Sequence, residues 1–278
     1  MPIKNYKSTR AARKKMSIVD RRELHKGQPH KALTHGRKRL SGRGSAGKIT
    51  IRHRGGGAKR LNRKVDFGQD KLAIPARVER LEFDPIRSAH LALIMFVDGV
   101  RRYVVAWEGA KAGDTIERGE KALEKPGNRK QLKDITPGVT VFNVEMMPGR
   151  GGKMLRSAGS YGTIMDVQGE YAQLQLASGE VRLIAKESYA TIGKVSNPDH
   201  WLQRIGSAGR SRRLGRRPQV RGKVMNPVDH PHGGGEGAQP IGLKAPKTKW
   251  GKPALGVKTR QKRRYSDNLI LERRNRKK

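Results

Sequence analysis

Apolar residues gather in short runs through the middle of the chain, and turn residues separate these runs. Ala89–Val97 is a continuous apolar run, Asp98-Gly99 follows it, and Val100–Trp107 is a second such run. Asp-Gly between two apolar runs is a strong β-hairpin signal. The pattern therefore predicts a hairpin over residues 89–107.

Similar runs recur on both sides of this hairpin, at a spacing of about ten residues. They predict strands at Leu72–Phe83, Gly113–Gly119, Val139–Met147, Thr163–Val167, Tyr171–Ala177, Val181–Ala185 and Tyr189–Val195. Short strands with frequent turns favour small antiparallel barrels over parallel βαβ units. Brief helices are expected only around Ala122–Lys125 and near His200–Ile205.

The Pro- and Gly-containing stretch Pro126–Pro137 is the natural joint between two barrels, one near 66–125 and one near 130–198. We divide the chain into an extended N-terminal arm (1–60), a first barrel (61–128), a second barrel (129–200) and an extended C-terminal arm (201–278). Gly and basic residues dominate both arms, and in isolation the N-terminal arm is expected to be disordered.

Positive charge is concentrated in the two arms. Residues 1–65 carry 21 Lys and Arg against 2 Asp and Glu, residues 66–200 carry 19 against 18, and residues 201–278 carry 22 against 4. The like charges within each arm repel one another, and this repulsion indicates a polyanionic partner. Nucleic acid fits best, because each neutralised phosphate releases a counterion. An anionic membrane is the alternative, but the arms lack an amphipathic Trp/Phe/Leu face.

Composition excludes several classes of protein. The chain has no cysteine, which rules out a disulfide scaffold, a thiolate metal site and a Cys nucleophile. No apolar run approaches the roughly 18 residues of a membrane span. The start, MPIKNYKSTRAARKK, has no hydrophobic segment and is not a signal peptide, although its Arg-rich character leaves an organelle transit peptide open.

One segment imitates a nucleotide-binding loop. Gly42–Lys48 has the glycine spacing of a phosphate-binding loop and of the dinucleotide fingerprint, both of which need a preceding strand and a following helix. The flanking HGRKRLS and KITIRHR are neither, and position 49 is Ile where a magnesium-binding hydroxyl is required. We reject the nucleotide site.

The segment Asn226–Gly237 reads NPVDHPHGGGEG and cannot build a core. Its prolines exclude a continuous helix or central strand, and Gly233, Gly234 and Gly235 allow close backbone approach. We expect a loop that becomes ordered against a partner. The preceding Arg-rich run offers bidentate and stacking contacts to phosphates and bases.

The run over residues 215–237, GRRPQVRGKVMNPVDHPHGGGEG, resembles the hallmark of the bacterial-type ribosomal protein L2 family of the large ribosomal subunit. Other motifs resemble that family in the same order: MPIKNYK at the start, HRGGGAKR (53–60), DPIRSAHLALI (84–94), PGRGGKMLRSAG (148–159), SGEVR (178–182), ATIG (190–193) and WGKPALGVKTR (250–260). Because the similarity begins at residue 2, it argues against a transit peptide.

The resemblance implies a mostly β protein with an OB-fold barrel followed by an SH3-like barrel, flanked by long basic arms threaded into large-subunit rRNA. It also implies early assembly, a place near the peptidyl-transferase region and contact with the small subunit. The sequence departs from the family at Lys223, Arg213 and Lys249, which puts local contacts there in doubt.

Residues predicted to contact RNA combine the basic motifs with those that the resemblance carries over. They are Arg54, Lys59, Arg60, Arg87, Arg156, Arg210, Arg212, Arg213, Arg216, Arg217, Arg221, Asn226, His230 and His232. Within the family, the equivalents of Arg87 and Arg156 are taken as rRNA contacts. An intramolecular salt bridge with one of the central acids is the alternative for both.

His230 and His232 allow three interpretations. A metal site lacks a Cys or a well-spaced acidic third ligand, and acid–base catalysis lacks an obvious orienting partner beyond the adjacent Asp229. Hydrogen bonding to RNA, or stacking on it, is favoured. Asp229 and Glu236 are the places where the loop could hold a cation or an RNA amino group.

The sequence therefore predicts a structural rRNA-binding protein that is not an enzyme. A nucleic-acid enzyme or chaperone with basic tails is the alternative, but the central acids are scattered singly along strands. Expected partners are large-subunit rRNA, small-subunit rRNA at an intersubunit bridge and neighbouring ribosomal proteins, with no membrane and no homo-oligomer. No cofactor or resident metal is expected. Magnesium ions bound at the interface with RNA are the one alternative. The expected location is the cytoplasmic ribosome, with an organellar ribosome as the alternative.

Overall fold

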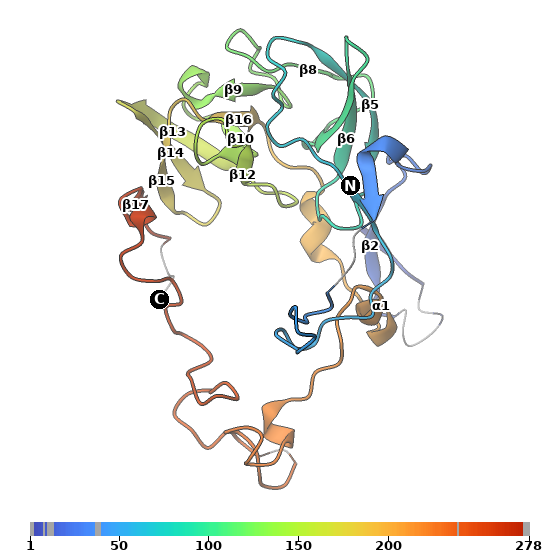
Figure 1. The fold of residues 1–278 in the computed structure, drawn as a ribbon, viewed down its shortest axis with the longest axis vertical. Helices are drawn as coiled ribbons and strands as arrows, with labels where there is room; N and C mark the ends of the chain where they lie inside the picture. The colour runs from blue at the N-terminus through green and yellow to red at the C-terminus, as the bar shows by residue number, and fades with distance from the viewer. Residues whose placement is uncertain (1–2, 8, 10–13, 37–39, 238, 275–278) are drawn as a thin grey trace. The chain divides into compact units, whose positions relative to one another are not determined.

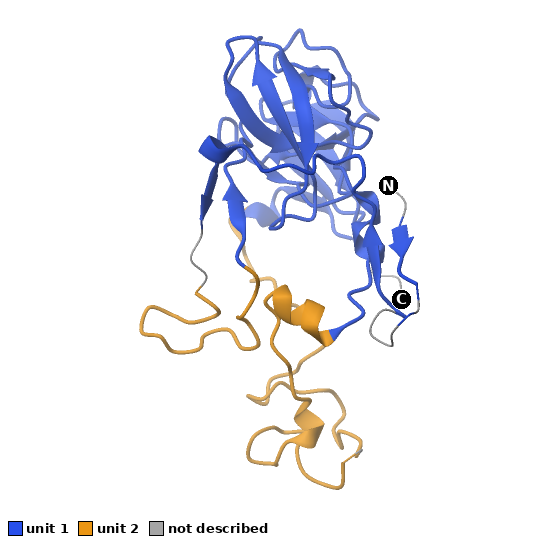
Figure 2. Ribbon diagram, turned by 90° about the vertical axis from the view of Figure 1, so that its right-hand side faces the viewer, with its two compact units in different colours: residues 1–38, 59–207, 266–278 blue, residues 39–58, 208–265 orange. Residues whose placement is uncertain are grey.

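The computed structural model describes residues 3–7, 9, 14–36, 40–237 and 239–274. Strands are its main regular structure (Figure 1). The chain forms two compact units, coloured separately in Figure 2: unit 1 comprises residues 1–38, 59–207 and 266–278, and unit 2 comprises residues 39–58 and 208–265. The predicted mostly β class is confirmed.

A four-stranded antiparallel sheet forms the first half of unit 1. Its strands, in spatial order, are β7 (Arg101–Val105), β6 (Leu91–Phe96), β5 (Ala76–Glu82) and β8 (Thr115–Ile116). The predicted hairpin is confirmed, because Leu91 pairs with Val105 and Met95 with Arg101. The backbone N–H of Phe96 donates to the Val100 carbonyl oxygen at 3.0 Å and closes the Asp98-Gly99 turn.

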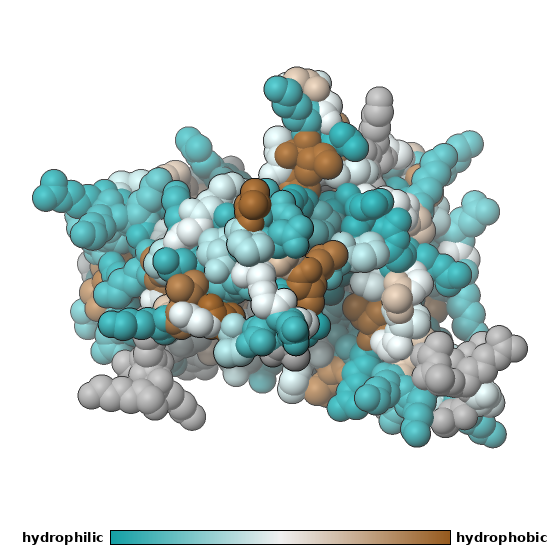
Figure 3. Space-filling model, turned by 90° about the horizontal axis from the view of Figure 1, so that it is seen from below, coloured by the Kyte–Doolittle hydropathy of each residue, from teal (hydrophilic) through white to brown (hydrophobic). Residues whose placement is uncertain are grey.

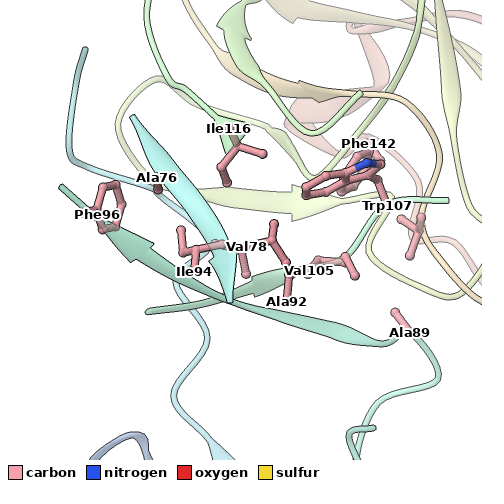
Figure 4. Packing of buried hydrophobic residues seen from close by; sticks show 13 residues of the cluster. Ala76, Val78, Ala89, Ala92, Ile94, Phe96, Val105, Trp107, Ile116 and Phe142 are labelled. Atoms are coloured by element: carbon pink, nitrogen blue, oxygen red, sulfur yellow. The ribbon is translucent and has the colours of Figure 1, made fainter. Parts of the chain in front are cut away.

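Hydrophobic residues cover both faces of this sheet, which explains why Ala89–Val97 is continuously apolar. One face packs into the cluster shown in Figure 4, in which Val78 and Ile94 lie between Phe96 at one end and Trp107 with Phe142 at the other. Leu91, Leu93 and Tyr103 form a separate buried cluster, against which Leu33 packs. A strand that is buried on both faces does not alternate in polarity.

A seven-stranded antiparallel sheet forms the second half of unit 1. Its strands, in spatial order, are β17 (Ile270–Glu272), β15 (Val181–Ala185), β14 (Tyr171–Leu176), β13 (Gly162–Gln168), β10 (Thr140–Phe142), β16 (Tyr189–Ile192) and β9 (Arg129–Gln131). Ile164, Leu174 and Ile192 belong to its core, and Leu132 and Val141 are also fully buried there. The predicted strands at 163–167, 171–177, 181–185 and 189–195 are confirmed within a few residues.

The predicted strand Val139–Met147 is broken in two. Asn143 has a positive φ of 49°, a left-handed conformation that no regular strand continues through. It separates β10 from β11 (Val144–Glu145), and β11 pairs with β12 (Gly152–Met154). A Cβ on Gly152 would lie 2.4 Å from the Asn143 carbonyl oxygen, so glycine permits this close approach.

Three other expectations need correction. The helix expected at Ala122–Lys125 is absent, and that segment is irregular with a single bend at Glu124. The helix expected at His200–Ile205 is a short 3-10 helix, η3 (Pro198–Leu202). The predicted strand Leu72–Phe83 starts only at Ala76, after Pro75, because proline cannot donate to a strand ladder. The joint Pro126–Pro137 also contains β9 and the 3-10 helix η2 (Leu132–Asp134).

The arms contribute ordered elements in both units. In unit 1, β1 (Ile3–Asn5) pairs with β2 (Ser17–Val19), and the 3-10 helix η1 (Lys31–Leu33) leads into β3 (Thr34–Gly36), which pairs with β4 (Leu61–Arg63). The last strand, β17, pairs with β15 (Figure 1). Unit 2 contains α1 (Ala208–Arg213) and η4 (Gly222–Val224), and η5 (Tyr265–Asp267) lies at its boundary with unit 1.

Candidate nucleic-acid interface

Unit 2 brings together glycine-rich segments from the two ends of the chain. The N–H of Gly55 donates to the Gly215 carbonyl oxygen at 3.0 Å, and the N–H of Ala58 donates to the Arg213 carbonyl oxygen at 2.9 Å. In return, the N–H of Arg217 donates to the His53 carbonyl oxygen at 3.0 Å. Residues 53–58 and 213–217 therefore run antiparallel. The sequence predicted two separate basic motifs, and the structure joins them.

The joined segments place like charges opposite one another. Arg54 and Arg216 are partners in an isolated antiparallel β-bridge, and both are exposed. Like charges directly opposite across a strand pair are destabilising. At Gly56, which has a positive φ of 64°, an added Cβ would lie 3.1 Å from Nη2 of Arg212. The missing side chain lets this guanidinium lie against the backbone.

Four arginines of this surface lack acidic partners within the described residues. No carboxylate lies within ion-pair distance of Arg54, Arg212, Arg213 or Arg216, and the buried Nη1 of Arg212 has no hydrogen-bond partner there. Several central arginines differ: Arg101, for example, binds Glu79 with its Nε at 2.8 Å from the carboxylate. On the surface formed by 53–58 and 208–217, these four arginines therefore carry positive charge that no described carboxylate compensates.

The loop Asn226–Gly237 is held by bonds within the chain. The Asn226 carbonyl oxygen accepts from the N–H of Asp229 at 3.0 Å, and the Met225 carbonyl oxygen accepts from the N–H of Gly234 at 3.0 Å. A Cβ on Gly233 would lie 2.2 Å from the Asn226 carbonyl oxygen, so a glycine is needed where the backbone at 233 passes close to the backbone at 226. The loop thus has internal hydrogen bonds that the sequence did not predict.

The two histidines of this loop are half-buried and lie against each other, with ring centroids 4.8 Å apart. Nδ1 of His230 accepts from the N–H of His232 at 3.0 Å, and Nε2 of His232 accepts from the N–H of Lys247 at 2.8 Å. The His230 ring also lies against Gly222, where a Cβ would come within 2.6 Å of it. One nitrogen of each ring is therefore engaged in shaping the loop.

Arg87 and Arg156, in unit 1, lie over the same aromatic ring. The Cζ atoms of Arg87 and Arg156 are 5.5 and 4.3 Å from the ring centroid of Phe67. Arg87 also forms the predicted alternative, an intramolecular ion pair, at 2.7 Å from the fully buried carboxylate of Asp84. Arg156 instead donates to the Gly152 carbonyl oxygen at 3.2 Å.

Partial burial and the positive charge of Arg87 lower the pKa of Arg156 from its ordinary value. Only Arg87 is paired with a carboxylate, so the two guanidiniums together carry excess positive charge, which suits a phosphate. Phe67 was missed by the sequence analysis. Its signal was weak, because a single Phe beside Asp66 belongs to no basic motif and to no predicted strand.

The remaining predicted residues lie at separate places in the two units. Arg60, in unit 1, donates to the Pro85 carbonyl oxygen at 2.9 Å, and Lys59 is exposed. In unit 2, Arg210 lies in α1 and is half-buried, whereas Arg217, Arg221 and Asn226 are exposed. The arrangement gathers the arginines of 208–217 with Arg54, and it does not gather all predicted residues into one site.

Hydrophilic side chains dominate the face shown in Figure 3, and hydrophobic residues occur there only in small separate groups. The described parts of the chain contain no helix that is long and apolar enough to cross a membrane. They also contain no group of three or more His, Asp or Glu side chains arranged to hold a metal ion. The surface formed by 53–58 and 208–217 offers guanidinium and backbone N–H donors, and the turn at 247–252 adds ammonium groups. Donors of these kinds suit phosphate oxygens.

Family models match most of the chain. The model of the RNA-binding N-terminal domain of ribosomal proteins L2 matches residues 30–118, and the model of the C-terminal domain of ribosomal proteins L2 matches residues 125–251. The chain belongs to the ribosomal protein L2 family. The resemblance noted from the motifs is confirmed, and the β-rich fold agrees with the OB-fold and SH3-like barrels of L2 domains.

Membership of the L2 family gives the chain a structural, RNA-binding role in the ribosome. Its partners are rRNA and other ribosomal proteins. The N-terminal domain match includes Arg54, Lys59, Arg60 and Arg87, and the C-terminal domain match includes Arg156 and the Asn226–Gly237 loop.

Proposed function

We propose that this L2 protein is a primary rRNA-binding, non-catalytic component of the large ribosomal subunit. It supports assembly of that subunit, association with the small subunit and the architecture near the peptidyl-transferase centre. The observation that carries the proposal is the pairing of Arg54 with Arg216, neither of which has an acidic partner among the described residues. A protein that places like charges opposite one another is stabilised by a polyanion between or beside them.

The proposed contacts follow the charged surfaces of each unit. In unit 2, Arg212, Arg213, Arg216 and Arg217 bind phosphates alongside Arg54. In unit 1, Arg87 and Arg156 hold a phosphate beside Phe67. Arg60, Lys59, Arg210, Arg221, Asn226, His230 and His232 complete the proposed set.

The proposed division keeps residues 1–60 and 201–278 as rRNA-threading arms, with an OB-like barrel at 61–128 and an SH3-like barrel at 129–200. It is supported by the two sheets, since β5–β8 and β9–β16 fall on either side of residue 128. The ordered elements of the arms are short, which leaves most of each arm available for RNA.

The proposed absence of catalysis rests on the hydrogen bonds of the histidines. A general base must use a free imidazole nitrogen that points at its substrate. Nδ1 of His230 and Nε2 of His232 already accept backbone N–H groups. We therefore assign both rings to loop shape and RNA contact.

The proposed partners beyond large-subunit rRNA are small-subunit rRNA at an intersubunit bridge and neighbouring ribosomal proteins. We propose that the protein forms no homo-oligomer and acts in the cytoplasmic ribosome. Asp229 and Glu236 are exposed acids in the histidine loop, and they are the places where an interface magnesium ion or an RNA amino group would bind.

The salt dependence of binding tests the proposal. Full-length protein is titrated with a large-subunit rRNA fragment at several salt concentrations. The slope of log K against log salt should be steep, and Arg54→Ala with Arg216→Ala should reduce its magnitude by about 2, since each lost phosphate contact removes about 0.9. Arg101→Ala, which removes an arginine paired with Glu79, is the matched control. A wild-type slope near one or two contradicts the proposal.

A further inference from the structure

Trp250 sits on a tight turn of unit 2 that backbone hydrogen bonds hold in place. The N–H of Thr248 donates to the Lys252 carbonyl oxygen at 2.7 Å, and the N–H of Gly251 donates to the Thr248 carbonyl oxygen at 2.9 Å. Lys247 and Pro253 form an antiparallel bridge at the base of the turn. The turn therefore presents the indole from a fixed backbone.

The histidine loop also supports this turn. The N–H of Lys247 donates to Nε2 of His232 at 2.8 Å, which ties the base of the turn to the loop. Gly251 has a positive φ of 76°, which the turn needs just after the tryptophan. A side chain held on such a fixed turn loses little conformational entropy on binding.

The indole of Trp250 is 70% exposed, whereas Trp107 in the core of unit 1 is 5% exposed. Two cations already lie near its ring: Cζ of Arg52 is 5.6 Å and Nζ of Lys249 is 4.8 Å from the centroid. Lys247 and Lys252 add positive charge in the same turn. An open aromatic ring with basic side chains around it matches single-stranded RNA, whose bases stack and whose phosphates are anionic.

We propose that Trp250 is a stacking platform for an unpaired RNA base, with Arg52 and Lys249 neutralising the adjoining phosphates. This inference rests on the proposed rRNA-binding function and adds a base-contacting site to it. Stacking tolerates any base, because every base has a π face, so the site recognises single-strandedness rather than sequence. An acidic peptide would satisfy the lysines and leave the indole open, so RNA is the occupant that uses both features.

Trp201 provides a matched comparison. It lies in η3 of unit 1 and is 80% exposed, but no lysine or arginine lies over its ring among the described residues. Replacing Trp201 with Phe leaves Trp250 and the buried Trp107 as the only tryptophans, since the chain has three. The double variant Trp201→Phe/Trp250→Phe reports Trp107 alone.

Fluorescence quenching tests the stacking directly. Full-length Trp201→Phe protein is titrated with a 12-nucleotide oligoadenylate, with inorganic polyphosphate and with polyglutamate. We expect oligoadenylate to quench a large part of the emission that Trp250 contributes, and the two polyanions without bases to leave it nearly unchanged. Equal quenching by polyphosphate or polyglutamate would overturn the proposal, because charge alone would then explain it.

Binding affinities provide the second readout. Trp250→Leu should weaken oligoadenylate binding by about 5- to 150-fold, the range that corresponds to one lost base stack. Trp250→Phe should lose less, because phenylalanine still stacks. Trp201→Leu should bind like the wild type, and polyphosphate should bind all of these variants equally.

Two failures are distinguishable in these titrations. If wild-type protein binds oligoadenylate and rRNA with a steep salt slope but Trp250→Leu binds as tightly, the stacking site is wrong and the rRNA-binding function stands. If the wild-type slope itself is shallow, the rRNA-binding proposal fails and the stacking site fails with it.

Discussion

Arg54 and Arg216, which are 162 positions apart in the sequence, face each other across an antiparallel β-bridge. Neighbouring backbone bonds from Gly55 to Gly215 and from Arg217 to His53 fix this pairing. The bridge costs electrostatic free energy in the free protein and becomes favourable when phosphates lie over it. Binding of RNA and joining of the two arms are therefore linked.

Reversing one charge of the bridge tests that linkage. Arg216→Glu turns the Arg54 contact from repulsive to attractive, so the N–H groups of Gly55 and Ala58 should exchange about 2- to 5-fold more slowly in the free protein. Amide hydrogen exchange by NMR measures this effect. Arg221→Glu makes the same change of charge outside the bridge and should leave both amides unchanged. Equal slowing by the two variants would show that net charge, and not the bridge, matters.

His230 should matter for loop shape and for subunit association rather than for peptide-bond chemistry. His230→Ala removes the acceptor for the His232 N–H, so association of the large and small subunits or assembly should be impaired. Peptide-bond formation in fully assembled particles should stay nearly normal. His230→Asn keeps an acceptor and should recover most of the association, as measured by sucrose-gradient sedimentation. A large loss of peptide-bond chemistry in assembled particles with His230→Ala would contradict this role.

Arg129 and Glu145 form a fully buried ion pair at 2.8 Å that ties β9 to β11. Burial lowers the pKa of Arg129 to about 10, so it is still protonated at neutral pH. Arg129→Met leaves the buried Glu145 carboxylate without its charged partner and should lower the free energy of unfolding by about 3–5 kcal/mol. The double variant Arg129→Met/Glu145→Leu removes both charges and should be more stable than the single variant. Urea denaturation measures both, and a less stable double variant would contradict the prediction.

His90 should make unit 1 sensitive to acid. Burial, first of all, lowers the pKa of His90 from 6.5 to about 4, and neither ring nitrogen has a hydrogen-bond partner among the described residues. Because the folded pKa is the lower one, its contribution to stability is complete above pH 6.5 and is lost as the pH falls towards 4.

Protonation of His90 in the unfolded protein should lower the free energy of unfolding by about 3 kcal/mol. His90→Leu removes the titrating group, so its unfolding free energy should depend less on pH over this range. Urea denaturation at pH 7 and pH 4.5 measures the difference between the two proteins. Identical pH dependence of variant and wild type would show that His90 is not responsible.

Much of unit 1 was predictable from local pattern. The Asp98-Gly99 turn and its flanking apolar runs specify a hairpin without help from distant residues, and the structure has it. Asn143 shows where local pattern fails. Its left-handed φ is imposed by the close approach of Gly152 and by the buried Arg129 that donates to its carbonyl oxygen at 2.9 Å. An alternating sequence contains no sign of either contact.

β17 shows the same limit at the C-terminus. Residues 270–272 read as part of a basic tail, yet they extend the second sheet by pairing with β15. A three-residue strand has little propensity of its own and forms only because the neighbouring strand offers unpaired N–H and C=O groups.

The sequence by itself determined the chemistry of this protein. Two basic, glycine-rich arms around a neutral β centre require a polyanion, because charge repulsion depends on composition and not on fold. Only the tertiary structure decided which basic residues act together. It joined Arg54 to Arg216 and placed Arg87 and Arg156 over Phe67, since such contacts depend on backbone hydrogen bonds and packing between segments far apart in the chain.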